Sequence, residues 1–176
     1  MDHEAAFNKL TNLNQLAKVL NLGEQVKQGV LYAMRLLSIA KRSELDLKLK
    51  LKHKGYPEEA IQQVIHLLKE KKLLNDLEFA KHKVYWSQYG NPVGRNRIRL
   101  ELRKKGLSED NISEALQEWD PSSEKEKALL LAKTRFDKLK TLDPTKRKKR
   151  IYDFLVRRGF AYEISREVIS ELERTQ

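Results

Sequence analysis

The sequence predicts an all-α protein of three tandem three-helix repeats, arranged as an elongated, curved array, plus an extra amphipathic helix at the N-terminus. Three observations support this fold class. Strong helix formers dominate the 176 residues, which include only 7 glycines and 4 prolines. Three of the glycines, Gly55, Gly106 and Gly159, follow one another at intervals of 51 and 53 residues. The same apolar pattern surrounds each of them, which indicates an internal repeat.

The repeated pattern predicts a helix, a glycine stop, a tight turn and a second helix. Apolar residues lie eight and four positions before each glycine and one, nine, ten and thirteen positions after it. The copies carry Leu51, Leu102 and Leu155 at minus four, Tyr56, Leu107 and Phe160 at plus one, and Leu68, Trp119 and Leu172 at plus thirteen. This spacing is helical, and glycine suits the left-handed residue that ends a helix. At plus six the third copy has Ser165 where the others have isoleucine, so we expect Ile164 to turn inward there.

A further helix precedes each glycine-centred pair and completes a three-helix unit. The first of these runs over residues 24–40, and the second begins near Asp76, which we expect to act as its cap. The third follows the break at Pro121, where Ser123 and Glu126 predict a capping box. Other helix starts are predicted at Ser43, Pro57, Ser108 and Asp143.

These elements predict four parts of the chain. Residues 1–23 form an N-terminal helical extension, whose amphipathic helix covers residues 2–20. Repeat 1 covers residues 24–74, repeat 2 residues 75–120 and repeat 3 residues 121–176. A unit of this size buries too little apolar surface to be stable alone, so we expect neighbouring repeats to stack.

The composition excludes several classes of protein. With no cysteine, the chain has no disulfide scaffold, no thiolate zinc site and no cysteine nucleophile. No apolar run approaches the ~20 residues that span a membrane. We therefore expect a soluble cytoplasmic monomer without a membrane partner.

The net charge of +11 is concentrated in three stretches. Residues 41–54 carry +4, residues 95–105 carry +5 and residues 146–158 carry +6, so the rest of the chain is net −4. Each stretch is the predicted middle helix of a repeat. A cationic helix repeated at fixed intervals predicts binding to a long polyanion such as a DNA backbone.

The basic residues of these stretches are the candidate binding residues. They are Lys48, Lys50, Lys52, Lys54, Arg95, Arg97, Arg99, Arg103, Lys104, Lys105, Lys146, Arg147, Lys148, Lys149, Arg150, Arg157 and Arg158. Cations in the last turn of a helix offset its dipole, which gives Lys104, Lys105, Arg157 and Arg158 a purely structural interpretation as well. Residues 146–150 begin their helix, where the dipole disfavours cations. Because no base-reading motif is present, the sequence predicts sequence-independent phosphate contact.

The sequence contains no pattern of residues that is typical of a catalytic or metal-binding site. The histidines His3, His53, His66 and His82 are scattered, and we expect His66 to be partly buried and neutral. Trp86 and Tyr89 could stack on nucleobases, but packing in the core is the favoured interpretation. We therefore predict no enzymatic activity, no metal and no cofactor.

The stretch from Leu73 to Leu116 resembles the RecX family. The matching residues are Leu74, Asn75, Asp76, Phe79, Ala80, Tyr89, Gly90, Arg97, Ile98, Arg99, Glu101, Leu102, Lys105 and Gly106. Residues 43–45 and 54–55 agree in the first repeat, and residues 154–155 and 157–160 in the third. The resemblance covers roughly residues 31–173. One departure is the family's Gly-Pro turn before the Arg-Ile-Arg motif, which is stretched here to GNPVGR over residues 90–95.

The resemblance implies a regulator of RecA in recombination, DNA repair and the SOS response. Such a protein would bind along the groove of the RecA–single-stranded DNA filament and inhibit its ATPase, growth and strand exchange. Two other functions stay open on the residues alone. The basic helices could bind single- or double-stranded DNA directly, or the chain could be a helical scaffold whose charge only confers solubility.

Overall fold

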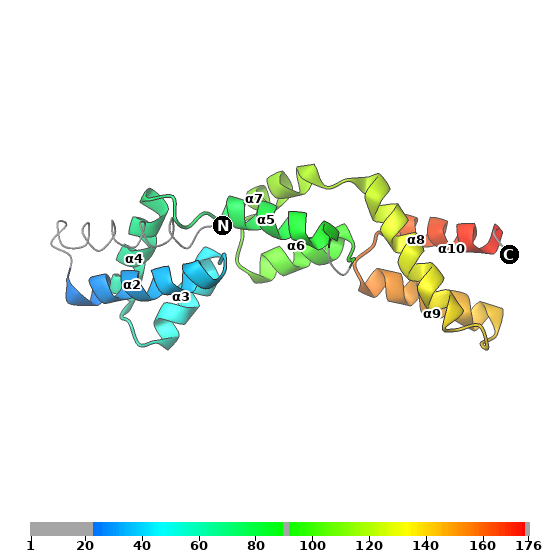
Figure 1. The fold of residues 1–176 in the computed structure, drawn as a ribbon, viewed down its shortest axis with the longest axis horizontal. Helices are drawn as coiled ribbons and strands as arrows, with labels where there is room; N and C mark the ends of the chain where they lie inside the picture. The colour runs from blue at the N-terminus through cyan, green and yellow to red at the C-terminus, as the bar shows by residue number, and fades with distance from the viewer. Residues whose placement is uncertain (1–22, 90–91, 175–176) are drawn as a thin grey trace. The chain divides into compact units, whose positions relative to one another are not determined.

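The computed structural model describes residues 23–89 and 92–174, and these residues form nine α-helices, one short 3₁₀ helix and no strand (Figure 1). The all-α prediction is confirmed. The chain divides into two compact units between Phe79 and Ala80. The helix predicted for residues 2–20 lies outside the described residues, and the elongated, curved arrangement stays a prediction.

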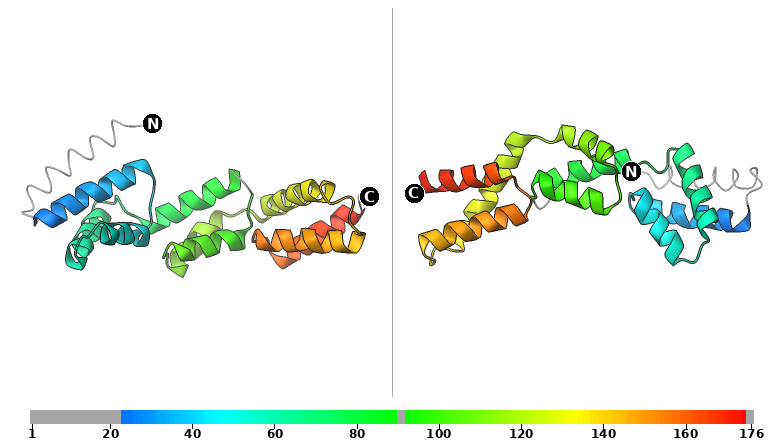
Figure 2. Two further views of the ribbon diagram at one scale, coloured as in Figure 1. Left: turned by 90° about the horizontal axis from the view of Figure 1, so that it is seen from below. Right: turned by 180° about the vertical axis from the view of Figure 1, so that it is seen from behind.

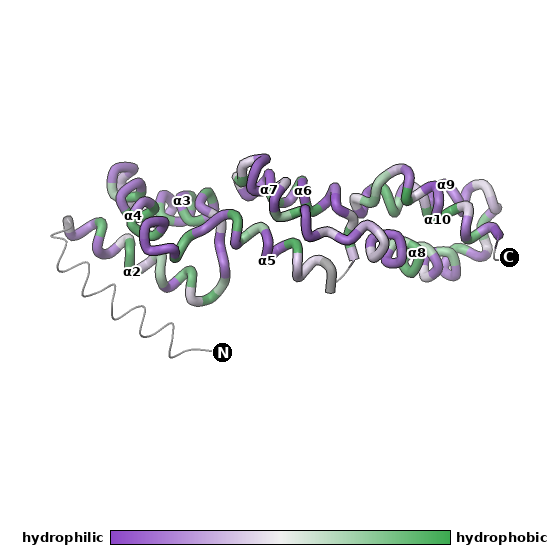
Figure 3. The backbone as a smooth tube through the Cα atoms, turned by 90° about the horizontal axis from the view of Figure 1, so that it is seen from above, coloured by the Kyte–Doolittle hydropathy of each residue, from purple (hydrophilic) through white to green (hydrophobic). Residues whose placement is uncertain are grey.

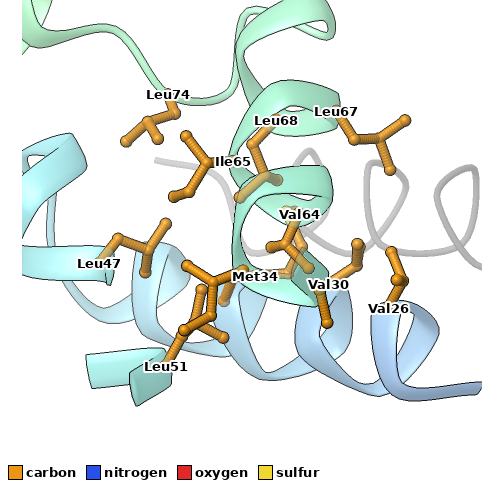
Figure 4. Packing of buried hydrophobic residues seen from close by; sticks show 13 residues of the cluster. Val26, Val30, Met34, Leu47, Leu51, Val64, Ile65, Leu67, Leu68 and Leu74 are labelled. Carbon is orange, nitrogen blue, oxygen red and sulfur yellow. The ribbon is translucent and has the colours of Figure 1, made fainter. Parts of the chain in front are cut away.

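The first unit contains a three-helix repeat. It consists of α2 (Glu24–Ile39), α3 (Glu44–His53) and α4 (Glu58–Glu70), which pack against one another. Apolar side chains from all three helices point into one core, in which Val30, Met34, Leu47, Leu51, Val64, Ile65, Leu68 and Leu74 are buried (Figure 4). Leu74 follows α4 and closes this core at 3% exposure.

The second unit contains the other two repeats. The second repeat consists of α5 (Asp76–Tyr89), which begins in the first unit, then α6 (Arg95–Lys104), α7 (Glu109–Ala115) and the 3₁₀ helix η1 (Leu116–Glu118). The third repeat consists of α8 (Pro121–Asp137), α9 (Pro144–Arg157) and α10 (Tyr162–Arg174), which lie side by side (Figure 2). Apolar residues recur along the helices between hydrophilic stretches (Figure 3), as an amphipathic helix requires.

The three repeat glycines end their helices as predicted. Gly55, Gly106 and Gly159 have φ of +93°, +80° and +87°. In each copy the amide after the glycine donates to the carbonyl of the leucine at minus four, with distances of 3.2 Å for Tyr56 to Leu51, 3.3 Å for Leu107 to Leu102 and 3.2 Å for Phe160 to Leu155. This is the Schellman motif, in which an apolar contact between these two positions is common. The repeated leucine and the apolar residue at plus one therefore belong to one capping device.

The predicted helix starts are partly confirmed. The side chains of Ser43, Ser108 and Asp143 accept hydrogen bonds from the amides three residues later, as expected. Two predictions are wrong by one to three residues. Asn75 caps α5 by accepting from the amide of Leu77 at 2.9 Å, and α8 is capped by Asp120, which accepts from the amides of Ser122 and Ser123. In each case a neighbouring side chain with the same chemistry reaches the free amides first.

Asp76 has a different task from the one predicted. Its carboxylate accepts a hydrogen bond from the backbone amide of Glu44 at 2.8 Å, so it satisfies the first turn of α3.

The third repeat keeps its helical register at the position where the pattern breaks. Ser165 is fully buried at the plus-six position, and Ile164 is only partly buried against the core. The expectation that Ile164 turns inward is therefore met only in part, because Ile164 packs against the core while Ser165 keeps the fully buried position. Within the described residues the Ser165 hydroxyl has no hydrogen-bond partner.

Candidate cationic binding surface

The candidate basic residues lie on three helices in two units. Those of the first stretch lie on α3 or directly after it, in the first unit. Those of the second and third stretches lie on α6 and α9, or directly after them, and both helices belong to the second unit. The structure therefore shows how the second and third stretches meet.

The C-terminal end of α9 meets the N-terminal end of α6. The amide of Gly94 donates to the Arg158 carbonyl at 2.9 Å, and the amide of Asn96 donates to the Gly159 carbonyl at 3.1 Å. Free carbonyls at the end of one helix thus satisfy free amides at the start of the other, and the two dipoles join head to tail. The backbones come so close that an added Cβ on Gly94 would lie under 3.0 Å from Gly159 and Phe160.

A buried carboxylate holds the same junction from the side of α8. Glu124 is 4% exposed and accepts hydrogen bonds from the Arg95 amide at 2.9 Å and from the Trp119 indole nitrogen at 2.8 Å. One acid therefore ties the start of α6, the end of repeat 2 and the first turn of α8 together. Sequence reasoning missed Glu124, because an acid in the first turn of a helix is ordinary by itself.

A groove of about 460 Å³ runs between α6 and α9. It is lined by Val93, Arg97, Glu101, Phe154, Arg157 and Arg158. Three arginines and one glutamate give it a cationic character. The junction of the two helices therefore brings one predicted residue of the second stretch together with two of the third.

Several candidate cations are already paired with acids of the same chain. Lys48 pairs with Glu44 at 2.7 Å, Arg97 with Glu101 at 3.0 Å and Arg99 with Glu109 at 3.6 Å. Arg103 also pairs with Glu109, and Lys148 pairs with Glu173. These pairs lie at the surface, where each contributes at most ~1 kcal/mol to stability.

The pKa values of the paired acids follow from their partners. Burial raises the pKa of Glu101, whereas hydrogen bonds from Lys83 and Arg97 lower it. The lowering is the larger effect, so the pKa of Glu101 lies below its usual range. The same balance, with Lys48 and Lys69 as partners, lowers the pKa of Glu44. The hydrogen bond from Arg103 lowers the pKa of Glu109.

Two candidate arginines contact aromatic rings. The Arg147 guanidinium lies 4.1 Å from the centre of the Phe136 ring, and that of Arg158 lies 5.3 Å from the centre of the Phe154 ring. Arg158 also donates to the Pro92 carbonyl at 3.3 Å. Both arginines therefore have structural contacts that the sequence did not predict.

The remaining candidates include cations that have no ion-pair partner among the residues the structure describes. They are Lys50, Lys52, Lys54, Arg95, Lys104, Lys146, Lys149, Arg150 and Arg157. All of these except the half-buried Lys50 are exposed.

Two side chains lie where the sequence did not place them. His66 is exposed and faces Glu70 at 3.4 Å, so the expectation of a partly buried histidine is wrong. Trp86 is 57% exposed, so its expected packing in the core is also wrong. The side chain of Tyr89 lies outside the described residues.

The described residues contain no group of three or more histidine, aspartate or glutamate side chains placed to hold a metal ion. None of the helices in the same ranges is long and apolar enough to cross a membrane.

The fold and this surface define a class: a small protein of three-helix repeats with a cationic groove where two repeats join. Family profiles match over most of the chain. The first, second and third three-helix domains of RecX match residues 31–68, 75–116 and 123–169. The chain belongs to the RecX family of regulatory proteins.

Individual relatives agree with this assignment. A regulatory protein RecX of Clostridioides difficile is 37% identical over 80% of this chain and 66% of its own length. One of Clostridium botulinum strain Eklund 17B is 38% identical over 74% of this chain and 61% of its own length. This chain therefore spans less than two thirds of the length of these two relatives. A regulatory protein RecX of Chlorobium limicola is 31% identical over 84% of this chain and 91% of its own length.

A crystal structure of RecX from Lactobacillus salivarius has a similar fold, with a TM-score of 0.78 and 26% identity over 86% of this chain and 99% of that one. Another RecX crystal structure reaches a TM-score of 0.77 at the same identity, over 82% of this chain and 71% of that one.

Proposed function

We propose that this chain binds a RecA filament assembled on single-stranded DNA and restrains it, which slows ATP hydrolysis, filament growth and strand exchange. Membership of the RecX family supports the choice of partner. The observation that carries the proposal is the cationic middle helix that recurs in each repeat. The chain would act in the cytoplasm as a monomer, in recombination, DNA repair and the SOS response, without enzymatic activity or a cofactor.

The candidate basic residues would have two different roles in this binding. Exposed cations without an acidic partner, such as Arg95, Lys104 and Arg157, keep their charge for an external phosphate or carboxylate. Paired cations such as Arg97 are partly neutralised by their own chain. We therefore expect the unpaired cations to account for most of the salt-dependent affinity.

The direct test is the DNA-dependent ATP turnover of RecA in the presence of substoichiometric amounts of this chain. We expect turnover to fall well before the two proteins are equimolar, because one bound chain would restrain several RecA protomers. Unchanged turnover at equimolar protein would contradict the proposal.

A charge-removal variant tests the surface itself. Arg95→Gln, Lys104→Gln and Arg157→Gln together remove three positive charges from α6 and α9. We expect weaker filament binding, and a slope of log affinity against log salt that is smaller by about 2–3, since each lost phosphate contact removes about 0.7–0.9. Circular dichroism should report unchanged helicity.

A matched control removes the same charge elsewhere. Lys71, Lys133 and Lys138 are exposed lysines outside the three basic stretches, and each is replaced by glutamine. We expect this variant to bind the filament nearly as well as the wild type. Equal weakening of both variants would mean that net charge alone, and not this surface, determines binding.

The alternative function, sequence-independent DNA binding, is separated by omitting RecA. A regulator of the filament should bind the filament at moderate salt more tightly than it binds naked DNA. Equal affinity for naked DNA and filament would favour the alternative.

A further inference from the structure

An exposed aromatic pair projects from α5. Tyr85 is 52% exposed and Trp86 is 57% exposed. Their ring centres lie 5.6 Å apart at an interplanar angle of 89°, an edge-to-face contact. The Trp86 indole nitrogen donates to His82 Nε2 at 2.8 Å. The Trp86 ring therefore has a defined orientation on the surface, although most of it is open to solvent.

Exposure of this tryptophan is a feature of its place on the helix. Ala80 and Val84 are the buried positions of α5, and Trp86 lies on the other side, three residues after Lys83. The other tryptophan, Trp119, is 6% exposed and is held by Glu124. A solvent-exposed tryptophan keeps a large apolar surface in contact with water, which is unfavourable. The exposure of Trp86 therefore indicates a binding partner that covers its ring.

Ion pairs link the helix that carries the aromatic pair to the cationic groove. Lys83 lies on the same flank of α5 as Trp86 and pairs with Glu101 of α6 at 3.1 Å. Glu101 also pairs with Arg97, which lines the groove together with Arg157. A short chain of ion pairs thus connects the flank of α5 that carries Trp86 to the groove between α6 and α9.

The charge around the pair identifies the kind of partner. Residues 79–105 contain eight lysines and arginines and a single acid, Glu101, which is shared by Lys83 and Arg97. Three acids further along the chain, Glu109, Glu114 and Glu118, pair with Lys81, Arg99 and Arg103. Within the described residues, Arg157 lines the groove without an ion-pair partner. The ligand should therefore bring an anionic group to the groove and should also offer a flat apolar face. Single-stranded DNA combines both properties, because its bases are free to stack while its backbone is charged. A duplex hides the faces of its bases.

We propose that Tyr85 and Trp86 form a stacking platform for an unpaired nucleobase of single-stranded DNA, whose adjoining phosphates occupy the groove at Arg157. The base lies on the open face of the Trp86 ring, and the edge-to-face contact with Tyr85 and the hydrogen bond to His82 hold that ring in place. This inference deepens the proposed function. It depends on that function in one respect, the identification of the bound strand as DNA.

The test measures binding of short oligonucleotides in the absence of RecA. The probes are oligo(dT), an abasic deoxyribose-phosphate strand of the same length, and a duplex. We expect oligo(dT) to quench the fluorescence of Trp86 and to bind about 5- to 150-fold more tightly than the abasic strand, since one stacked base is worth that factor. The duplex should not quench.

Two variants assign the effect to this platform. Trp86→Leu removes the stacking face, so oligo(dT) should bind as weakly as the abasic strand, whose own affinity stays unchanged. Trp86→Phe should recover part of the difference, because phenylalanine still stacks. Tyr162→Leu is the matched control, because Tyr162 is 59% exposed and lies on α10, a helix with four acids. This variant should bind both oligo(dT) and the abasic strand as tightly as the wild type does.

The outcomes separate this inference from the proposed function. Wild-type affinity of Trp86→Leu for oligo(dT), or equal binding of oligo(dT) and the abasic strand by the wild type, overturns the platform. If Trp86→Leu also inhibits RecA normally, the proposed function stands without it. If Trp86→Leu loses inhibition of RecA but binds oligo(dT) normally, the aromatic pair contacts protein and the inference is likewise overturned.

Discussion

Replacement of Gly94 by alanine tests whether the head-to-tail junction of α9 and α6 holds repeats 2 and 3 together. Gly94 has φ of −79° and ψ of 161°, values that alanine adopts without strain. The added Cβ would nevertheless lie under 3.0 Å from backbone atoms of Gly159 and Phe160, which cannot move aside as a side chain could. The two helix ends must therefore separate.

The cost of this separation follows from the hydrogen bonds at the junction. Two neutral backbone bonds would be lost, from Gly94 to Arg158 and from Asn96 to Gly159. A third bond, from the Arg95 amide to the Glu124 carboxylate, would be lost or weakened. At about 0.5–1.5 kcal/mol for a neutral bond and about 1.5–3 kcal/mol for a charged one, Gly94→Ala should lower the free energy of unfolding by about 2.5–6 kcal/mol.

Gly23 supplies a matched control. It is also the N-cap of a helix without a side-chain cap, but a Cβ added there meets nothing within 4 Å. Gly23→Ala should change the free energy of unfolding by less than ~1 kcal/mol, because the loss of a favourable N-cap is offset by lower entropy of the unfolded chain.

Urea titration followed by circular dichroism gives both unfolding free energies, and hydrogen exchange reports the Asn96 amide directly. We expect fast exchange of this amide in Gly94→Ala. Equal stability of the two variants, with the Asn96 amide protected in both, would show that the junction does not hold the repeats together.

Two further predictions concern single surface residues. Lys72 ends α4 with φ of +54°, the left-handed region, so Lys72→Gly should raise the free energy of unfolding by up to ~1 kcal/mol in urea titration, whereas Lys71→Gly, at an ordinary φ of −80°, should lower it. Glu101→Gln should cost about 0.5–1 kcal/mol at neutral pH, because it breaks the pairs with Lys83 and Arg97. Since the pKa of Glu101 is lowered in the folded state, its contribution is complete above the unfolded value of ~4.3 and is lost as the pH falls through the lower folded value. Unfolding free energies of wild type and Glu101→Gln should thus converge below about pH 4, and a constant difference down to pH 2 would contradict this assignment.

Local features of the fold were predictable because neighbouring residues alone determine them. A glycine at the end of an apolar helix pattern takes the left-handed conformation whatever surrounds it, as at Gly55, Gly106 and Gly159. Caps such as Ser43 and Asp143 were predictable for the same reason. Where two capping side chains are adjacent in sequence, as at Asn75 and Asp76, the pattern could not decide which of them reaches the free amides.

The candidate site was predictable in its composition but not in its geometry. The sequence places the cations on the middle helix of each repeat, yet whether a given cation is neutralised depends on acids elsewhere, such as Glu109 for Arg103 and Glu173 for Lys148. The exposure of Trp86 could not be predicted from the sequence either, because a tryptophan at helical spacing is compatible with both a core and a surface position.

The sequence by itself determined that the chain is helical, that it repeats three times and that its positive charge recurs on one helix of each repeat. These properties depend on periodicity and on contacts within a few residues. Only the tertiary structure decided that Gly94 meets Arg158, that Glu124 is buried at the same junction and that Arg97, Arg157 and Arg158 line one groove. These contacts join residues about 30 to 66 positions apart, and they form only when whole helices pack.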